Sequence, residues 1–339
     1  MIDKPKIRSF FVAFFVAVTV CTMMSCNGKV LSGKPGSSGK TQELIVVASN
    51  AVYTHEMRST VEEVFAAPQE VLNQPEPMFD VVRLSPSQFD GNTMFQAHRN
   101  VLMLEVSSEN ADKVYLEYDK WALPQVVVRI AATSAAKLDS LLRASQKRIV
   151  KEFYAQEYRR MAKVFADMPN VKVNDFVQKK YGLKMTFPNE FMVAKSEGSF
   201  SWIRKETKDF GLGVLIDIVP ERFADNSDAL LNWMDTTMKR NVPGSVDSSY
   251  MGTERRVDCI SRKVDINGVE ATEIRGLWRT FGDHMGGPYV SYTFASPKQG
   301  GRIMLIAYVY SPSYRSKSFS KRDLLMQVDG ICRTTQLSE

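Results

Sequence analysis

The first half of the chain alternates apolar runs with segments of helical periodicity, a pattern typical of an α/β domain. Buried-type strands are predicted at residues 43–49, 79–84, 100–106 and 125–131. Apolar residues three and four positions apart predict a helix that Thr54 caps and Pro68 ends. A second helix, roughly 45 Å long, is predicted from Ser134 to about Val164. We therefore predict that residues 42–168 form an N-terminal α/β sandwich whose helices cover mainly one face of the sheet.

The second half is richer in short strands and hairpin turns, so it predicts a different architecture. Strands are expected at residues 183–188, 200–206, 213–219, 257–265, 269–277, 289–295 and 303–310. Helices are expected at residues 175–181, 227–239 and 324–331. Asn267-Gly268 is a strong type I′ hairpin signal, so residues 169–339 are predicted to form an α+β domain with a mostly antiparallel sheet and flanking helices. Its opening, Gly-Leu-Lys-Met-Thr-Phe-Pro at 182–188, resembles the start of a Mog1/PsbP-type sandwich.

The first 26 residues have the order of a bacterial lipoprotein signal. A basic start precedes the apolar run 10–20, and the small residue Ser25 precedes Cys26. We predict that residues 1–25 are removed and that Cys26 carries lipid; residues 26–41, rich in Gly, Ser, Pro and Lys, would be a flexible tether. The apolar core is shorter than the roughly 20 residues of a membrane span, but a membrane helix and a cleaved signal without lipid remain alternatives.

Charge and cysteine content follow from this processing. Removal of residues 1–25 lowers the net charge from +6 to +4, which is too weak for a nucleic-acid surface, since such a surface needs a concentrated basic stripe. Cys259 and Cys332 then remain beside the anchor. In an oxidising compartment they are candidates for a disulfide; two separate buried thiols are the alternative.

The chain lacks the common motifs of catalysis and metal binding. Its three histidines have no ligand spacing, and Ser59 stands where a second zinc ligand would follow His55-Glu56. No Cys-x-x-Cys or Gly-x-Ser-x-Gly sequence occurs. We therefore expect no metal and no cofactor, and favour a binding or scaffold role over an enzyme, which stays open.

One stretch, residues 273–292, combines residue types that are common in binding sites. Its candidate residues are Arg275, Trp278, Asp283, His284, Gly286, Gly287 and Tyr289. Arginine and aromatic residues dominate interfaces, and glycines let a backbone approach a ligand closely. The alternatives are a hydrolase or transferase in which Asp283 and His284 act in an interdomain cleft, and a plain hairpin with Trp278 in the core and solvated arginines.

Two further polar groups are weaker candidates. His98 and Arg99 stand directly before a strand, where they could line a cleft or simply cap the solvated end of the strand. The long predicted helix carries basic and acidic residues interleaved on one side; these are Lys147, Arg148, Lys151, Arg159, Arg160 and Lys163, with Asp139, Glu152 and Glu157. This pattern predicts a solvated face, with contact to lipid headgroups or an acidic partner as the alternative.

Several motifs together resemble a known family. They are Gln74-Pro75-Glu76-Pro77, His98-Arg99-Asn100, Trp121 with Pro124-Gln125, and the segments 202–207, 274–278 and 285–292. Over nearly all of residues 42–335 the chain resembles a Bacteroidota lipoprotein family, domain of unknown function 4837. We expect the protein to face the periplasm from the outer membrane, with an unidentified envelope protein or small ligand as partner. The resemblance implies a Bacteroidota source and a lipid anchor. It assigns no reaction.

Overall fold

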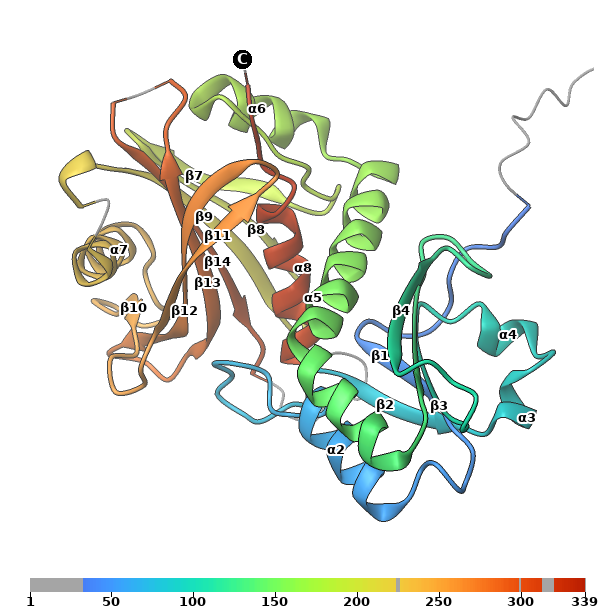
Figure 1. The fold of residues 1–339 in the computed structure, drawn as a ribbon. Helices are drawn as coiled ribbons and strands as arrows, with labels where there is room; N and C mark the ends of the chain where they lie inside the picture. The colour runs from blue at the N-terminus through green and yellow to red at the C-terminus, as the bar shows by residue number, and fades with distance from the viewer. Residues whose placement is uncertain (1–32, 224–225, 299, 313–319, 339) are drawn as a thin grey trace, which may run out of the picture.

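A long helix joins two sheets in a mixed α+β structure (Figure 1). The computed structural model describes residues 33–223, 226–298, 300–312 and 320–338. The long helix, α5 (Ala135–Asp167), starts on the N-terminal sheet and continues along helix α8 (Lys321–Cys332) of the C-terminal domain. Within the described residues, no helix has the length and apolar character needed to span a bilayer.

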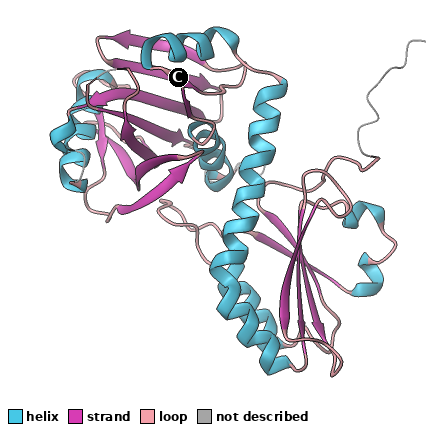
Figure 2. Ribbon diagram, turned by 45° about the horizontal axis from the view of Figure 1, so that its top comes forward, coloured by secondary structure: helices cyan, strands magenta, loops and turns pink. Residues whose placement is uncertain are grey.

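The N-terminal sheet has five strands in the order β2-β1-β3-β5-β4. They are β1 (Glu43–Val47), β2 (Asp80–Leu84), β3 (Asn100–Val106), β4 (Lys113–Tyr118) and β5 (Val126–Ala132). All pair in parallel except β4, an edge strand that the apolar pattern does not predict because its residues are only partly buried. Helix α2 (His55–Phe65) and α5 cover one face, while the short helices α3 (Pro86–Phe89) and α4 (Thr93–Gln96) lie on the other (Figure 2).

The C-terminal sheet is antiparallel throughout and has eight strands. They are β7 (Met192–Glu197), β8 (Phe200–Glu206), β9 (Gly211–Val219), β10 (Tyr250–Thr253), β11 (Ile260–Ile266), β12 (Val269–Phe281), β13 (Gly286–Ala295) and β14 (Arg302–Tyr310). Strands β6 (Leu183–Lys184) and β15 (Gln336–Leu337) form a separate two-stranded ribbon. Positive φ angles of 53° and 86° at Asn267 and Gly268 confirm the predicted hairpin between β11 and β12.

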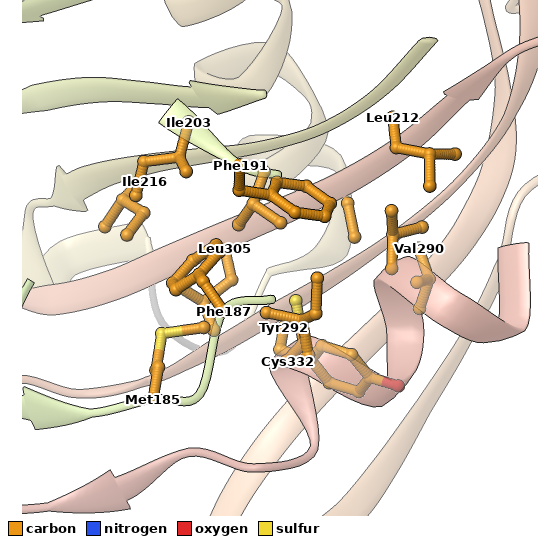
Figure 3. Packing of buried hydrophobic residues seen from close by; sticks show 14 of the residues in the cluster. Met185, Phe187, Phe191, Ile203, Leu212, Ile216, Val290, Tyr292, Leu305 and Cys332 are labelled. Carbon is orange, nitrogen blue, oxygen red and sulfur yellow. The ribbon is translucent and has the colours of Figure 1, made fainter. Parts of the chain in front are cut away.

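Helices cover both faces of this sheet. Helix α7 (Ser227–Asn241) lies on one face, and α6 (Val171–Tyr181) and α8 (Lys321–Cys332) pack on the other (Figure 1). Figure 3 shows the core beneath α6 and α8. Helix α8 is buried along its whole length because α5 covers its outer side; at Gly330 a Cβ atom would lie 3.2 Å from the Met161 sulfur.

The two remaining cysteines lie on opposite faces of this sheet. Cys259 contacts the Tyr289 hydroxyl at 3.4 Å on the α7 face, whereas Cys332 is buried in the core beneath α8. Both are free thiols. The predicted disulfide is therefore wrong, because the sheet itself separates the two sulfur atoms.

Part of the predicted flexible tether is packed against the N-terminal domain. The Ser37 and Ser38 amides donate to the Leu123 and Ala97 carbonyls at 3.0 and 2.9 Å. Gly39 adopts a φ of +94°, and a Cβ atom there would collide with the His98 ring. The prediction of a free tether is thus wrong for residues 36–39, while Cys26 and the leader lie outside the described residues.

Candidate functional site

Two cavities flank α5 where it passes between the domains. One, of about 280 Å³, is lined by Thr41, Arg99, Glu157, Arg160, Met161, Val164, Phe165, Met168, Pro188, Glu190, Phe191, Lys205, Gln327 and Ile331. The other, of about 420 Å³, is lined by Ala155, Tyr158, Arg159, Ala162, Thr186, Asp265, Ile266, Asn267, Gly330, Arg333, Thr334 and Gln336. We call them the junction cavity and the polar groove. Helices α5 and α8 are in contact, and each of the two cavities has lining residues from both of them.

A fully buried carboxylate, Glu157, organises one end of the junction cavity. Its two oxygens accept hydrogen bonds from Arg99 Nη1 at 2.9 Å, Asn100 Nδ2 at 2.7 Å and the Gln42 amide at 3.3 Å. These donors stand at the amino-terminal ends of β1 and β3, two inner strands of the sheet. The Glu157 carboxylate of α5 is therefore bound at the strand ends of the N-terminal sheet. A buried charge of this kind is tolerated only where it is paired and hydrogen-bonded.

Arg160 lies beside Glu157 and is 93% buried. Its Nε donates to Ser37 Oγ at 3.1 Å, and its Nη2 donates to the Arg99 and Pro124 carbonyls at 2.7 and 3.0 Å. Nη1 is 3.1 Å from Glu157 Oε1, yet has no acceptor in good hydrogen-bonding orientation. Burial lowers the pKa of Arg160 to about 10, against the opposing attraction of Glu157. Two arginines therefore share one carboxylate.

The rest of the junction cavity is mostly apolar. Met161, Phe165 and Phe191 form buried walls, and at the rim Val164 and Met168 are 57% and 69% exposed. Lys205 and Glu190 form an ion pair at 3.0 Å near the same rim. Across the described parts of the chain, no cluster of three or more His, Cys, Asp or Glu residues could hold a metal ion. The cavity thus has apolar walls and one cationic end.

The polar groove borders a second buried network of charges. Arg275 Nη2 is 2.6 Å from Asp329, Arg333 Nε is 3.0 Å from the same carboxylate, and Tyr292 donates to it at 2.6 Å. Burial alone would raise the pKa of Asp329, but Arg333, Arg275 and the tyrosine hydrogen bonds outweigh it and hold this pKa well below its ordinary value. Since Tyr158 of α5 also donates to Asp329 at 2.7 Å, the network joins α5, α8 and the sheet.

Three of the predicted site residues are buried in the C-terminal domain, one in the Asp329 network and two in the core beneath α7. Arg275 belongs to the Asp329 network and is not solvated, so that alternative is wrong for it. Trp278 lies in the core, where its Nε1 donates to the Val309 carbonyl at 3.0 Å. Tyr289 is fully buried against Gly276. Their side chains hold strands and helices together.

The other residues of the same stretch do not converge with Arg275. Asp283 accepts the Ser245 amide at 3.1 Å in the β12–β13 turn, and the neighbouring His284 is exposed. Neither lines the junction cavity or the polar groove. A Cβ atom at Gly286 or Gly287 would meet the Trp278 or Val309 carbonyl at 2.9 or 2.1 Å, so these glycines admit a neighbouring strand.

His98 is buried and Arg99 is mostly covered, contrary to the solvated cap that the strand start suggests. His98 Nε2 lies 2.9 Å from Glu43 Oε2, and Arg99 reaches the junction cavity. Glu157 and Arg160 are also buried, although interleaved charges predict a solvated helix face. For these two residues the prediction is wrong, because the strand ends of the sheet and the residues around Ser37 cover this side of α5. Exposure is confirmed for the other basic residues, Lys147, Arg148, Lys151, Arg159 and Lys163. In the sequence, the only signal that links Glu157 to Arg160 is that an acidic and a basic residue stand three positions apart on a helix.

The segment Gln74–Pro77 connects the two domains on the far side of α5. The Glu76 carboxylate accepts the Lys321 and Arg322 amides at 3.0 and 2.9 Å, at the start of α8. Arg322 in turn donates to the Pro77 carbonyl at 2.7 Å and to Asp80 at 2.9 Å. An N-terminal-domain carboxylate thus satisfies free amides of a C-terminal-domain helix.

Comparison with known proteins divides the chain into two family matches. Residues 170–334 match a domain of unknown function, DUF4837, and residues 37–166 match another, DUF8532. The resemblance seen in the sequence is therefore confirmed for the C-terminal part, whereas the motifs at 74–77 and 98–100 lie within the second match. Among curated proteins, no match to the chain is found.

Proposed function

We propose that this chain, whose residues 170–334 belong to the DUF4837 family, is a cell-envelope lipoprotein that binds a ligand between its two domains. Lipid on Cys26 would anchor it to the outer membrane, with both domains facing the periplasm. The signal-like order of residues 1–26 supports this proposal. Surface-exported lipoproteins of the Bacteroidota often carry acidic residues just after the lipidated cysteine. No acidic residue stands between Cys26 and Glu43, and this supports the periplasmic side.

The observation that carries the binding role is the junction cavity itself. Both domains contribute to its wall: Arg99 comes from the N-terminal sheet, Phe191 and Lys205 come from the C-terminal domain, and α5 runs between them. Ligand sites occur preferentially at such domain interfaces. An envelope hydrolase or transferase at Asp283 and His284 is less well supported, because those two residues are remote from this cavity's lining.

The anchor is tested by replacement of the acylated cysteine. Two acyl chains or more give firm membrane attachment, so Cys26→Ser is expected to move the chain from the membrane fraction to the soluble periplasmic fraction. Cys259→Ser, at a cysteine that stays within the folded chain, is the matched control and should remain with the membrane. Equal membrane association of both variants would contradict the lipid anchor.

The ligand site is tested by the mass of the Cys26→Ser chain purified from its native host. A bound small molecule should add mass under native conditions and be lost under denaturing ones. Val164→Trp, which fills the cavity mouth, should abolish the added mass, whereas Val257→Trp on an exposed surface should not. The same mass under both conditions, or a ligand retained by the Val164→Trp variant, would contradict the proposed site.

A further inference from the structure

We propose that the junction cavity binds a small amphipathic anion, a medium-chain carboxylate in its simplest form. The anionic head would lie near Arg99 and Lys205, and the apolar body would pack against Phe165, Phe191 and Ile331. This inference rests on the proposed binding role and specifies its ligand class.

Positive and negative charges do not balance among the residues at the Arg99 end of the cavity. Among the described residues that line it, the charged ones are Arg99, Glu157, Arg160, Glu190 and Lys205. Lys205 and Glu190 pair with each other at the rim. The two arginines are left with one carboxylate, so this end of the cavity carries one formal positive charge in excess.

Glu157 does not offset both arginines. Its oxygens already accept three hydrogen bonds, and it leaves Arg160 Nη1 without a well-oriented acceptor. Asp119 also attracts Arg160, but it is held by the Gln125 amide at 2.8 Å and does not line the cavity, so the excess positive charge among the lining residues remains. Because an uncompensated buried cation is costly, an anion at the Arg99 end would complete the charge balance.

The other residues that line the cavity favour a ligand whose body is apolar and small. Met161, Phe165 and Ile331 are buried and apolar, and the exposed side chains of Val164 and Met168 extend this surface to the mouth. A fully hydrated anion would leave these walls without contact. The volume of about 280 Å³ lies just below the roughly 300–1,000 Å³ of sites for drug-sized ligands, so a whole phospholipid would not fit.

Calorimetric titration of the full chain carrying Cys26→Ser tests the ligand class without detergent. The probes are octanoate, 1-octanol, octylammonium and acetate, which separate the head group from the tail. Octanoate is expected to bind at least about tenfold more tightly than any of the other three, a difference of about 1.4 kcal/mol. Charge-assisted hydrogen bonds to a guanidinium are strong enough for such a preference.

Charge variants locate the head group. Arg99→Gln and Lys205→Gln are each expected to weaken octanoate binding about tenfold. Lys205 is the safer variant for folding, because its ion pair is partly exposed. Arg159→Gln is the matched control: it removes a neighbouring positive charge of α5 that faces the polar groove, so octanoate affinity should not change.

The possible results distinguish failure of the proposed ligand class from failure of the proposed binding role. Equal binding of octanoate and octanol, preference for octylammonium, or full affinity in the Lys205→Gln variant would overturn the amphipathic-anion proposal. If a ligand of another class is nevertheless lost on Val164→Trp substitution, the binding role stands. If no ligand depends on Val164, both proposals fail.

Discussion

Arg275 and Asp329 lie 2.6 Å apart where water does not reach them, and Glu273 and Arg333 complete the same buried network. Replacing a buried ion pair as a whole can be neutral, but removing one partner leaves an unpaired charge in the core. These buried ion pairs explain Arg275 without any role in binding a ligand. The sequence alone places this arginine in a candidate binding site, but its role in the structure is to pair with buried carboxylates.

Substitution of Arg275 by methionine should therefore destabilise the fold. We expect a loss of about 3–5 kcal/mol in the free energy of unfolding, because Asp329 and Glu273 keep their burial and lose a counter-charge. Denaturant titration measures it. Arg256→Met, at an exposed ion pair with Glu254, is the control and should leave the unfolding midpoint nearly unchanged. Equal stability of the Arg275 variant and the wild type would refute this role.

The same network predicts an acid-sensitive fold. The folded pKa of Asp329 is below its ordinary value of 3.8, so its stabilising contribution is complete above that value and is lost as the pH falls further. Below pH 3.8, each further unit of acidification lowers the free energy of unfolding by at most about 1.4 kcal/mol through this carboxyl. Urea unfolding between pH 5 and pH 2 should show a shallower acid slope for Asp329→Asn than for the wild type; identical slopes would contradict the assignment.

Gly287 gives a prediction that separates strand packing from ligand contact. A Cβ atom there would lie 2.1 Å from the Val309 carbonyl oxygen, so Gly287→Ala should cost about 1–3 kcal/mol of stability through overpacking. Gly300→Ala, where no atom lies within 4 Å of the added carbon, is the control. Thermal unfolding that shows no difference between these two variants would disprove the close approach.

At the scale of elements, α5 and α8 hold the two domains together. Gly330 lets α8 approach Met161 and Phe165 of α5, and Tyr158 adds a hydrogen bond to Asp329. The start of α8 is capped by Ser320 and by the Glu76 carboxylate of the other domain. Elements from both domains therefore meet at one helix end.

Glu76→Gln should weaken this contact. Loss of the negative charge at the helix start is expected to cost about 1 kcal/mol and to speed hydrogen exchange of the first-turn amides of α8. Glu70→Gln is the matched control, since Glu70 reaches Arg262 across the same boundary through an exposed ion pair. Faster exchange in both variants, or in neither, would argue against a specific role for Glu76.

Local signals in the sequence predict most of these elements. Thr54 and Ser134 cap α2 and α5 as expected, and Asn267-Gly268 forms its hairpin, because each signal acts within a few residues. The burial of Glu157 and Arg160 could not be predicted, since it depends on which distant segment covers that side of α5. The same holds for Cys259 and Cys332, whose separation depends on the sheet order.

The whole molecule consists of an N-terminal α/β domain and a C-terminal α+β domain that α5 joins (Figure 2). A charged cavity with apolar walls lies at their junction. Each domain alone supplies only part of that wall. Residues from both family matches line the cavity, so neither half would form it by itself.

Binding of an amphipathic anion in the junction cavity can be seen directly in a crystal structure of the full chain carrying Cys26→Ser, grown with 8-bromooctanoate. The account predicts an anomalous bromine peak among Phe165, Phe191 and Ile331, and a carboxylate within hydrogen-bonding distance of Arg99. A bromine site elsewhere on the molecule, with the junction cavity free of the probe at saturating concentration, would contradict it.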